Sequence, residues 1–527
     1  MTLKQKIIAE LQKLTKIKDI ILIKAPIHTG ADFTTNIALK TGANPEELIK
    51  KIKKSKLFSK IENNKNFINL WVKQEMLIKN FQNFLLAKKQ KPKIKGLKIN
   101  VEFLSSNPTG MPQLGNGRNG FWGHALCNIL KASGNNITRE FYLNDSKESK
   151  QIQELGMTVL GKAKTYNSLY LKQKIKELKK NKILNENSLQ KNPGEIGRIM
   201  AEAIFKDMKS FFKKINIKFD NFFSEDELYS SGVIKQLLTI LEDKNLVYMK
   251  DGALWIKLKE FGHTQDEVIA RSNGKPTYLM ADIAYHKNKF ERNFDKLIVI
   301  LGADHHNHAS RLKIIAKIWG YNKPFDILIT QLVRVKHNNK TSKMSKRLGT
   351  AVELEKTINN VGADATRFML LSQSIESHMV FDTMLLKKKN NNNPIYYIQY
   401  AHARIYSVFA KIKNQKTLRK LLWKTKSKIT NYKIQTKFIK QEEINLIKKV
   451  LELQDVVLEI SQNYKVNLLT EYLSELAKLF HNYYDKYRII DEKNIKTTET
   501  RLVLITGVKM ALEKGLKLLG INAPEKM

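Results

Sequence analysis

One stretch, residues 97–135, constrains the fold of this chain more than any other part of the sequence. Apolar residues alternate over its first positions, which predicts a buried β-strand. Residues 105–117 then combine glycine, proline and small polar side chains and predict a loop. From about Arg118 apolar residues recur at helical spacing, so we expect a helix that ends near Ser133.

A strand, a glycine-rich loop and a helix N-terminus in this order can bind phosphate. The first N–H groups of a helix lack partners and carry the positive end of its dipole. Gly115 and Gly117 would let a nucleotide approach the backbone closely. No GxxxxGK[ST] motif occurs, which excludes a P-loop. The alternative is a loop that merely connects strand and helix, and the spacing alone leaves the two interpretations evenly balanced.

The charge of the chain points to a polyanionic partner. It has 93 Lys and Arg against 50 Asp and Glu, a formal net charge of +43. Such a field would steer and hold a nucleic acid. The chain is also rich in Lys, Asn and Ile, so biased composition is an alternative source of part of the excess.

Other features of the composition exclude whole classes of protein. The single cysteine, Cys127, excludes an internal disulfide and fits a reducing compartment. No run approaches 18 apolar residues, and the first residues lack the apolar core of a secretory signal. We therefore expect a cytoplasmic protein without membrane contact.

Composition and pattern divide the chain into three segments. Residues 1–92 mix helical and strand patterns and end in a Lys-rich linker, which predicts a small α+β domain. Residues 93–386 carry the strand–loop–helix unit and further apolar strands, so we expect an α/β domain with insertions at about 162–260. Residues 387–527 open with a Lys- and Asn-rich linker and then predict helices throughout.

A second group of candidate functional residues lies in the latter half of the α/β segment. Asp282 stands among apolar residues, where a carboxylate is costly unless it meets a cation. A ligand guanidinium would suit it, because a planar fork matches a carboxylate; a solvated aspartate at a helix start is the alternative. The apolar run 297–303 predicts a strand buried on both faces, and Asp304 and the histidines within 305–308 follow it. They could bind a ligand beyond the strand or, without support from any Cys, ligate zinc.

The apolar run 327–335 predicts another strand, which leads into a lysine-rich loop. Lys343 and Lys346 in this loop could close on a triphosphate and offset the charge that develops on pyrophosphate. Two lysines at this spacing are weak support in a chain with so many. Near the end of the chain, tyrosines and basic residues at 483–488 could stack on bases, with core packing as the alternative.

Several of these motifs together resemble those of arginyl-tRNA synthetases, a family of class I aminoacyl-tRNA synthetases. The motifs are residues 101–110 with 113–118 (the first class I signature), 278–282, 302–306, 343–346 (Lys-Met-Ser-Lys, the second signature) and 397–405. The resemblance covers nearly the whole chain, except residues 162–193 and about 410–445. It implies a Rossmann-like catalytic domain at 93–386, an N-terminal additional domain at 1–92 that contacts tRNA, and an α-helical anticodon-binding domain at 387–527.

The resemblance also implies a reaction. The arginine carboxylate attacks the α-phosphate of ATP to give arginyl-adenylate and pyrophosphate, and the arginyl group then passes to the terminal ribose of tRNA(Arg). The expected partners are L-arginine, ATP and tRNA(Arg), with Mg²⁺ accompanying ATP without a dedicated protein cage and no resident metal. A monomer is expected, with tRNA needed even in the first step.

Individual site residues follow from the same resemblance. The expected catalytic residues are Gln113, Asn116, Lys343 and Lys346. The expected arginine-binding residues are Glu102, Ser105, Asn107, Tyr278, Asp282, Asp304 and His305. The expected ATP-binding residues are Pro108, Thr109, Gly110, Gly115, Gly117, Met344 and Ser345. The expected tRNA-binding residues are Tyr397, Tyr400, Arg404 and Met527.

The chain departs from the family at its first signature, where Gln113 and Asn116 replace two histidines. An amide can donate N–H bonds but carries no charge. Since losing one oriented donor can cost about 10²–10³ in rate, we predict reduced but not abolished activity. One alternative is a non-catalytic tRNA-binding paralogue, against which the retained substrate pocket argues. Another is a class I synthetase for a different amino acid, against which Tyr278 and Asp282 and the lack of an editing-sized insertion argue.

Overall fold

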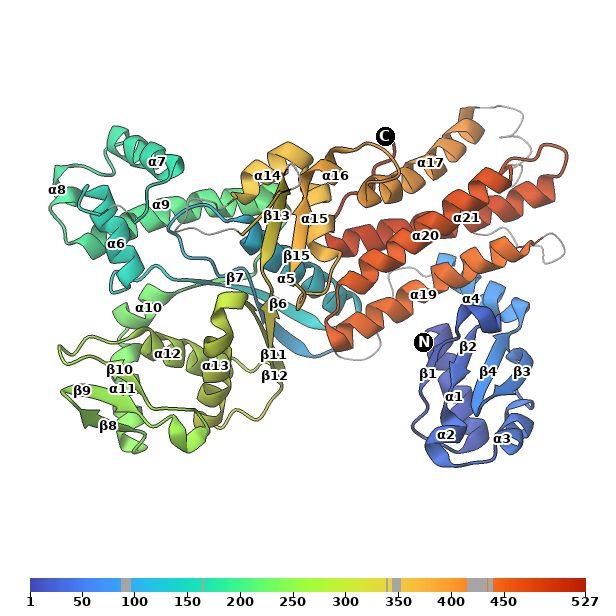
Figure 1. Ribbon diagram of the computed structural model, residues 1–527, viewed down its shortest axis with the longest axis horizontal. Helices are drawn as coiled ribbons and strands as arrows, with labels where there is room; N and C mark the ends of the chain where they lie inside the picture. The colour runs from blue at the N-terminus through green and yellow to red at the C-terminus, as the bar shows by residue number, and fades with distance from the viewer. Residues whose placement is uncertain (87–95, 164, 338–339, 344–351, 415–433, 435–438) are drawn as a thin grey trace.

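The computed structural model of the protein describes residues 1–86, 96–163, 165–337, 340–343, 352–414, 434 and 439–527. Figure 1 shows a parallel sheet with its helices at the centre, a helical bundle that extends to one side, and an N-terminal lobe below that bundle. The expected fold class, α/β with an α+β N-terminal part and an all-α C-terminal part, is confirmed. In the described part of the chain, no helix is long and apolar enough to cross a membrane.

The N-terminal lobe is built on a four-stranded antiparallel sheet with the order β1–β2–β4–β3. Its strands are β1 (Leu22–Lys24), β2 (Phe33–Thr35), β3 (Phe58–Asn64) and β4 (Phe67–Val72). Its helices are α1 (Leu3–Thr15), η1 (Ile27–Thr29), α2 (Ile37–Thr41), α3 (Pro45–Ile52) and α4 (Gln74–Leu86). Ile68, Leu70 and Val72 are buried at alternate positions of β4, as expected for a sheet with one covered face.

A five-stranded, all-parallel sheet forms the core of the central segment, with the order β12–β11–β5–β6–β7. Its strands are β5 (Lys98–Glu102), β6 (Asn136–Leu143), β7 (Asn221–Ser224), β11 (Lys296–Gly302) and β12 (Phe325–Thr330). The chain leaves β5 toward β6 and later returns on the other side of β5 with β11. Such a reversal of strand order opens a crevice at the carboxyl ends of the strands, where ligands bind in α/β proteins.

Helix α5 (Leu114–Ala132) begins four residues before the predicted start at Arg118. The Gln113 backbone N–H donates to Asn116 Oδ1 at 2.9 Å, which satisfies one group at the helix start. Gly115 and Gly117 therefore lie in the first helical turn and not in a loop. The turn packs closely on Leu354, because a Cβ on Gly117 would lie 2.7 Å from Leu354 Cδ1 and would require that side chain to shift. The glycines here allow close packing of a helical turn. From the sequence alone, glycines in such a turn cannot be distinguished from glycines in a loop.

Two insertions lie in the sequence between strands of this sheet. The first, between β6 and β7, consists of α6 (Lys150–Val159), α7 (Leu169–Lys180), α8 (Glu186–Leu189) and α9 (Pro193–Lys214). The second, between β7 and β11, consists of α10 (Glu225–Ser230), α11 (Val233–Asp243), β8 (Val247–Lys250), β9 (Ala253–Ile256), η2 (Lys259–Phe261), β10 (Glu267–Ala270) and α12 (Tyr278–Glu291). The strands β8, β9 and β10 form an antiparallel sheet of their own.

The single strand predicted over 327–335 is wrong: the run contains β12 and a separate strand, β13 (Val333–His337). The chain changes sheets at Gln331, whose N–H donates to Ile375 O at 2.9 Å and whose carbonyl accepts from Arg118 at 2.9 Å. Apolar periodicity alone cannot separate one strand from two. The remaining elements are η3 (Ala303–His305), α13 (His306–Ile318), β14 (Lys340–Lys343), α14 (Leu354–Val361), α15 (Ala363–Leu371), β15 (Met379–Asp382) and α16 (Thr383–Lys387).

The C-terminal segment is helical in its described residues, as predicted. Its helices are α17 (Pro394–Asn414), α19 (Gln441–Asn463), α20 (Asn467–Lys486) and α21 (Ile495–Leu519). The bundle is joined to the central domain through Arg367 of α15, which is 2% exposed and donates to Leu519 O at 3.1 Å and Asn216 O at 3.3 Å. The N-terminal lobe meets the bundle where Phe81 packs on Gly507, since a Cβ there would lie 2.3 Å from the ring.

Candidate active site

The candidate site lies at the carboxyl ends of the central strands. Glu102 is the last residue of β5, Glu225 follows β7, and Gly302 ends β11. Helix α12 crosses this end and carries Asp282. The topology therefore brings together carboxylates that are far apart in the sequence.

The turn after β5 contains the unusual backbone conformation of Leu104. Its φ is 66°, in a left-handed region that a bulky residue rarely adopts. The conformation is held because the Leu104 N–H donates to Asn119 Oδ1 at 2.6 Å, while Asn119 Nδ2 donates to Ile300 O at 2.9 Å. Conformations of this kind concentrate at functional sites. Here the turn brings Ser105 back to Glu102, with 3.1 Å between Oγ and Oε1.

Helix α12 carries two of the predicted arginine-binding residues, Tyr278 and Asp282. Asp282 is mostly buried, and its Oδ2 lies 3.4 Å from His308 Nδ1 of α13. Burial raises the pKa of Asp282, which the positive fields of His308 and Arg311 oppose. Tyr278, one turn earlier on the same helix, is 43% exposed. The pair thus offers one largely buried and one more exposed group on the same helix.

Glu225 is a candidate that the sequence analysis missed. It is 2% exposed, and its Oε1 has no hydrogen-bond partner. Burial raises the pKa of Glu225 to about 8, against the lowering effect of the Tyr142 hydroxyl, and the charges of Asp282 and Asp145 raise it further. In sequence the residue resembles an ordinary acidic helix start, and only the position of β7 in the sheet reveals it.

The start of α5 is bound to the segment that follows the lysine-rich loop. Leu114 N–H donates to Val352 O at 2.9 Å, and Leu354 N–H donates to Pro112 O at 3.0 Å. Of the predicted residues before it, Pro108 and Thr109 are buried, and Asn107 and Gly110 are half-buried. Lys343 is the last residue of β14, whereas Met344, Ser345 and Lys346 lie outside the described residues.

Asp304 and His305 lie beyond β11 with open side chains, which are 82% and 53% exposed. They are not enclosed with Asp282, although the His305 and His308 rings lie 5.9 Å apart. Over the described residues, no group of three His, Cys, Asp or Glu side chains is placed to hold a metal ion. This end of the site is open to solvent.

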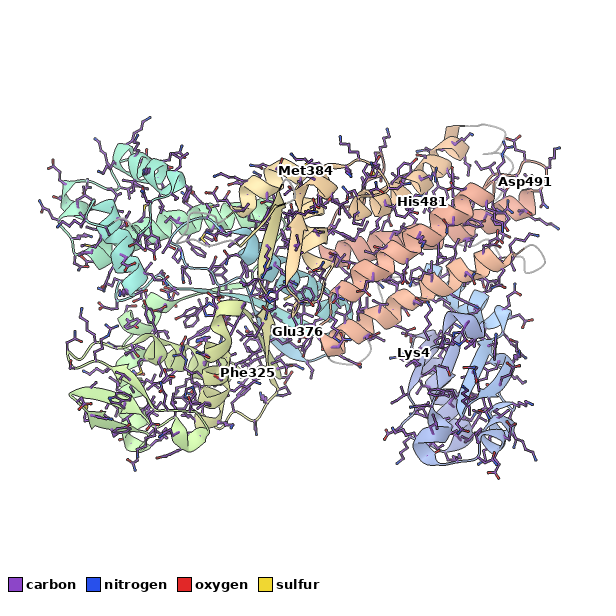
Figure 2. The ribbon with its side chains drawn as sticks, viewed as in Figure 1. Lys4, Phe325, Glu376, Met384, His481 and Asp491 are labelled. Atoms are coloured by element: carbon purple, nitrogen blue, oxygen red, sulfur yellow. The ribbon has the colours of Figure 1, made fainter. Side chains whose placement is uncertain are left out.

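The predicted tRNA-binding tyrosines lie on α17 against α20. His481 of α20 lies within the bundle (Figure 2), 4.3 Å from the Tyr397 ring and 5.7 Å from the Tyr400 ring. Arg404 lies 4.4 Å from the Tyr484 ring and donates to Asp485 at 3.2 Å. Met527 is 52% exposed. These rings are partly used for packing, and Arg404 already has an acidic partner.

Comparison with protein families identifies the two larger parts of the chain. The model described as "tRNA synthetases class I (R), catalytic domain" matches residues 80–380, and the DALR anticodon binding domain matches residues 398–527. The chain belongs to the class I arginyl-tRNA synthetases. Its resemblance to this family, and the enzyme class that it implied, are therefore confirmed.

Individual relatives agree over the full length. The arginine–tRNA ligase of Aquifex aeolicus is 33% identical, with 99% of each chain covered. The arginine–tRNA ligase of Oceanobacillus iheyensis is 34% identical, with 98% of this chain and 96% of the relative covered. The solved arginyl-tRNA synthetase of Thermus thermophilus has the same fold, with a TM-score of 0.77, 18% identity and 99% of each chain covered.

Proposed function

We propose that this chain activates L-arginine with ATP and transfers the arginyl group to tRNA(Arg), and that Asp282 and Glu225 hold the guanidinium. One observation carries this assignment of roles. Two other buried carboxylates have cationic partners: Asp226 has Arg198 and Glu443 has Arg501. Glu225 instead has a partnerless oxygen, and burial raises the pKa of both Glu225 and Asp282. Two such carboxylates in one crevice suit a cationic substrate that brings its own charge.

The other end of arginine is assigned to β5. Glu102 would accept from the α-ammonium group beside Ser105, with Asn107 on the same loop and Tyr278 at the guanidinium end. Asp304 and His305, beyond β11, would line the pocket of the arginine and its adenylate. In this arrangement the enzyme contributes mainly position and charge, since the nucleophile is the carboxylate of the substrate itself.

ATP is assigned to the start of α5. Residues 108–110 and the first turn with Gly115 and Gly117 would line the nucleotide, where unpaired helix N–H groups favour phosphate. Asn116 accepts from the Gln113 N–H with its Oδ1, which leaves its Nδ2 free to donate to a phosphate oxygen. Lys343 and Lys346 are proposed to balance the charge on the leaving pyrophosphate, with Met344 and Ser345 beside them.

The remaining partners follow the family. Tyr397, Tyr400, Arg404 and Met527 are proposed to contact tRNA(Arg). Mg²⁺ would accompany ATP through phosphate and water ligands. We also propose that the chain acts as a monomer in the cytoplasm.

Arginine-dependent exchange of pyrophosphate into ATP tests this function directly. We expect exchange when tRNA(Arg) is present, with little or none in its absence, and aminoacylation under the same conditions. Lysine in place of arginine serves as the control and should give no exchange. The non-catalytic alternative predicts tight tRNA binding without exchange in any condition, and that result would overturn the proposal.

Arginine binding should also release a proton. At pH 7 a carboxyl group with a pKa of about 8 is mostly protonated, and a bound guanidinium favours its ionised form. We therefore expect release of up to about one proton per arginine and an affinity that increases from pH 6 to pH 8. Calorimetry in buffers of different ionisation enthalpy measures the release. Glu225→Gln should remove most of it, and release that persists in this variant would contradict the role of Glu225.

A further inference from the structure

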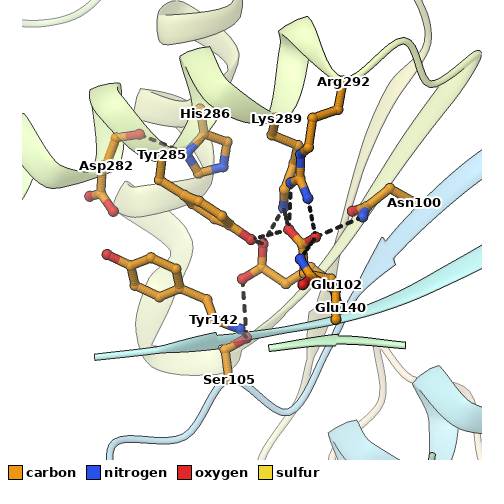
Figure 3. Close-up of polar contacts among 11 residues, drawn as sticks. Asn100, Glu102, Ser105, Glu140, Tyr142, Asp282, Tyr285, His286, Lys289 and Arg292 are labelled. Atoms are coloured by element: carbon orange, nitrogen blue, oxygen red, sulfur yellow. Dashed lines mark hydrogen bonds and ion pairs between the residues drawn. The ribbon is translucent and has the colours of Figure 1, made fainter. Parts of the chain in front are cut away.

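A cluster of charged side chains lies behind Glu102, and the roles above leave it unused. The register of β5 and β6 pairs Glu102 with Glu140, and these residues are only 6% and 0% exposed. Two adjacent buried carboxylates cannot both be ionised without cations. Helix α12 provides them from one face, where Tyr285, Lys289 and Arg292 point toward the two carboxylates (Figure 3).

Glu140 is the fixed end of this cluster. Arg292 binds both of its oxygens, with 2.7 Å between Nη2 and Oε1, and Asn221 donates to Oε2 at 2.9 Å. Burial opposes ionisation of Glu140, but the charge of Lys289 and the contacts of Arg292 outweigh it and lower the pKa of Glu140 well below its usual range. Glu140 therefore stays charged and has little freedom to move.

Lys289 joins Glu140 to Glu102. Its side chain is fully buried, and its Nζ binds Glu102 Oε2 and lies 3.6 Å from Glu140 Oε1. The Tyr285 hydroxyl lies 2.9 Å from the same Glu102 oxygen and 2.6 Å from Glu140 Oε1. The contacts from α12 thus fall on Oε2, whereas Oε1 is turned to the exposed Ser105. The cluster thus holds one oxygen of Glu102 from inside the protein and leaves the other in contact with Ser105, on the side away from α12.

We propose that Lys289, which lies beside the Glu140 carboxylate that Arg292 binds, is a positioning residue that balances the charge of Glu102 and aims its Oε1 at the α-ammonium group of the amino-acid substrate. The inference rests on the proposed function, which assigns that group to Glu102. Lys289 never touches the substrate. Asp282 lies on the same helix seven residues before Lys289, a rise of about 10 Å. Helix α12 therefore fixes the distance between the side chains that serve the two ends of the substrate.

The test is Lys289→Met, which removes the charge and keeps an unbranched, apolar side chain. The KM values for arginine and ATP are measured by exchange with tRNA, and arginine binding is measured by calorimetry. The inhibition constant of 5-guanidinopentanoate, which lacks the α-amino group, is measured alongside. Loss of a charge-assisted contact to Glu102 should raise the KM for arginine about 10- to 100-fold. The KM for ATP and the inhibition constant should stay within about threefold, since neither depends on the ammonium contact.

A second substitution distinguishes an effect of charge from an effect of packing, because only a charge effect is reversed when neutrality is restored. Lys289→Met leaves two carboxylates facing one guanidinium, and adding Glu140→Gln restores neutrality. The double variant should return the KM for arginine to within about fivefold of the wild-type value. Tyr285→Phe is the second variant, for use if Lys289→Met does not fold. It keeps all the charges and removes one donor to Glu102 Oε2, so it should weaken arginine and leave the inhibition constant of 5-guanidinopentanoate unchanged. Lys449→Met is a matched control, because Lys449 is a buried lysine of α19 that pairs with Glu452 and Glu475 in the C-terminal bundle.

Equal weakening of arginine and 5-guanidinopentanoate would show that Lys289 serves folding alone and would overturn the proposal. An unchanged KM for arginine in Lys289→Met would overturn it as well. A wild-type protein that neither exchanges nor binds arginine would instead contradict the proposed function, so the two failures are distinguishable.

Discussion

Asp282→Asn is expected to lower kcat/KM for arginine by about 10²–10³-fold. Removing one partner of a buried charge pair typically costs 2–5 kcal/mol, and 1.36 kcal/mol corresponds to a factor of ten. Asparagine keeps the size of the side chain but places an NH₂ donor where a guanidinium also presents donors. Steady-state exchange at varied arginine concentration measures the change, which should appear mainly in the KM for arginine.

The comparison requires two controls. The KM for ATP in Asp282→Asn should remain near the wild-type value, since the α5 turn is a separate part of the crevice. Asp243→Asn on the exposed end of α11 changes the net charge by the same amount away from the site and should leave kcat/KM unchanged. A loss below about threefold in Asp282→Asn would mean that Asp282 does not bind the guanidinium.

The sequence predicts the parts of this protein whose signals are local. The apolar run that forms β11 and the apolar faces of α5 and α9 identify the sheet and its helices. A strand buried on both faces is apolar throughout, and a helix buried on one side has apolar residues every three or four positions. The apolar neighbours of Asp282 in the sequence also indicated that its carboxylate would be shielded from solvent, and its side chain is 19% exposed. The predicted ends of helices and strands were wrong where tertiary contacts decide them. This is the case at the start of α5, where Gly117 packs against Leu354, and at Gln331, where the chain changes sheets.

The candidate site was only partly predictable, since it depends on which strands are neighbours. Tyr285, Lys289 and Arg292 have helical spacing and could be grouped from the sequence, but their partner Glu140 is identified only by the register of β5 and β6. Glu225 is similar, because its role depends on the place of β7 at the edge of the sheet. Pairing between distant segments leaves no periodic signal in one sequence.

Asn116→Asp is expected to lower the rate of adenylate formation by about 10²–10³-fold with little change in thermal stability. Asn116 has two separable contacts at the start of α5. Its Oδ1 accepts from the Gln113 N–H at 2.9 Å, and its Nδ2 is the proposed donor to ATP phosphate. Aspartate keeps the acceptor and suits a helix N-terminus, so the cap survives. It cannot donate and adds a negative charge beside the phosphates. Single-turnover adenylate formation and the melting temperature separate the two effects.

Asn116→His completes the argument, because a histidine can accept from the Gln113 N–H with Nδ1 and donate with Nε2. We expect adenylate formation at about the wild-type rate in this variant, since the neutral imidazole keeps the acceptor for the Gln113 N–H and offers Nε2–H to a phosphate oxygen in place of the amide. Asn116→Ala loses both contacts and should lower the rate and the melting temperature together. If Asn116→Asp instead keeps a rate within about threefold of the wild type, the amide is only a helix cap. The phosphates would then depend on the backbone N–H groups of the first turn of α5. The signature histidine that Asn116 replaces would have no functional substitute.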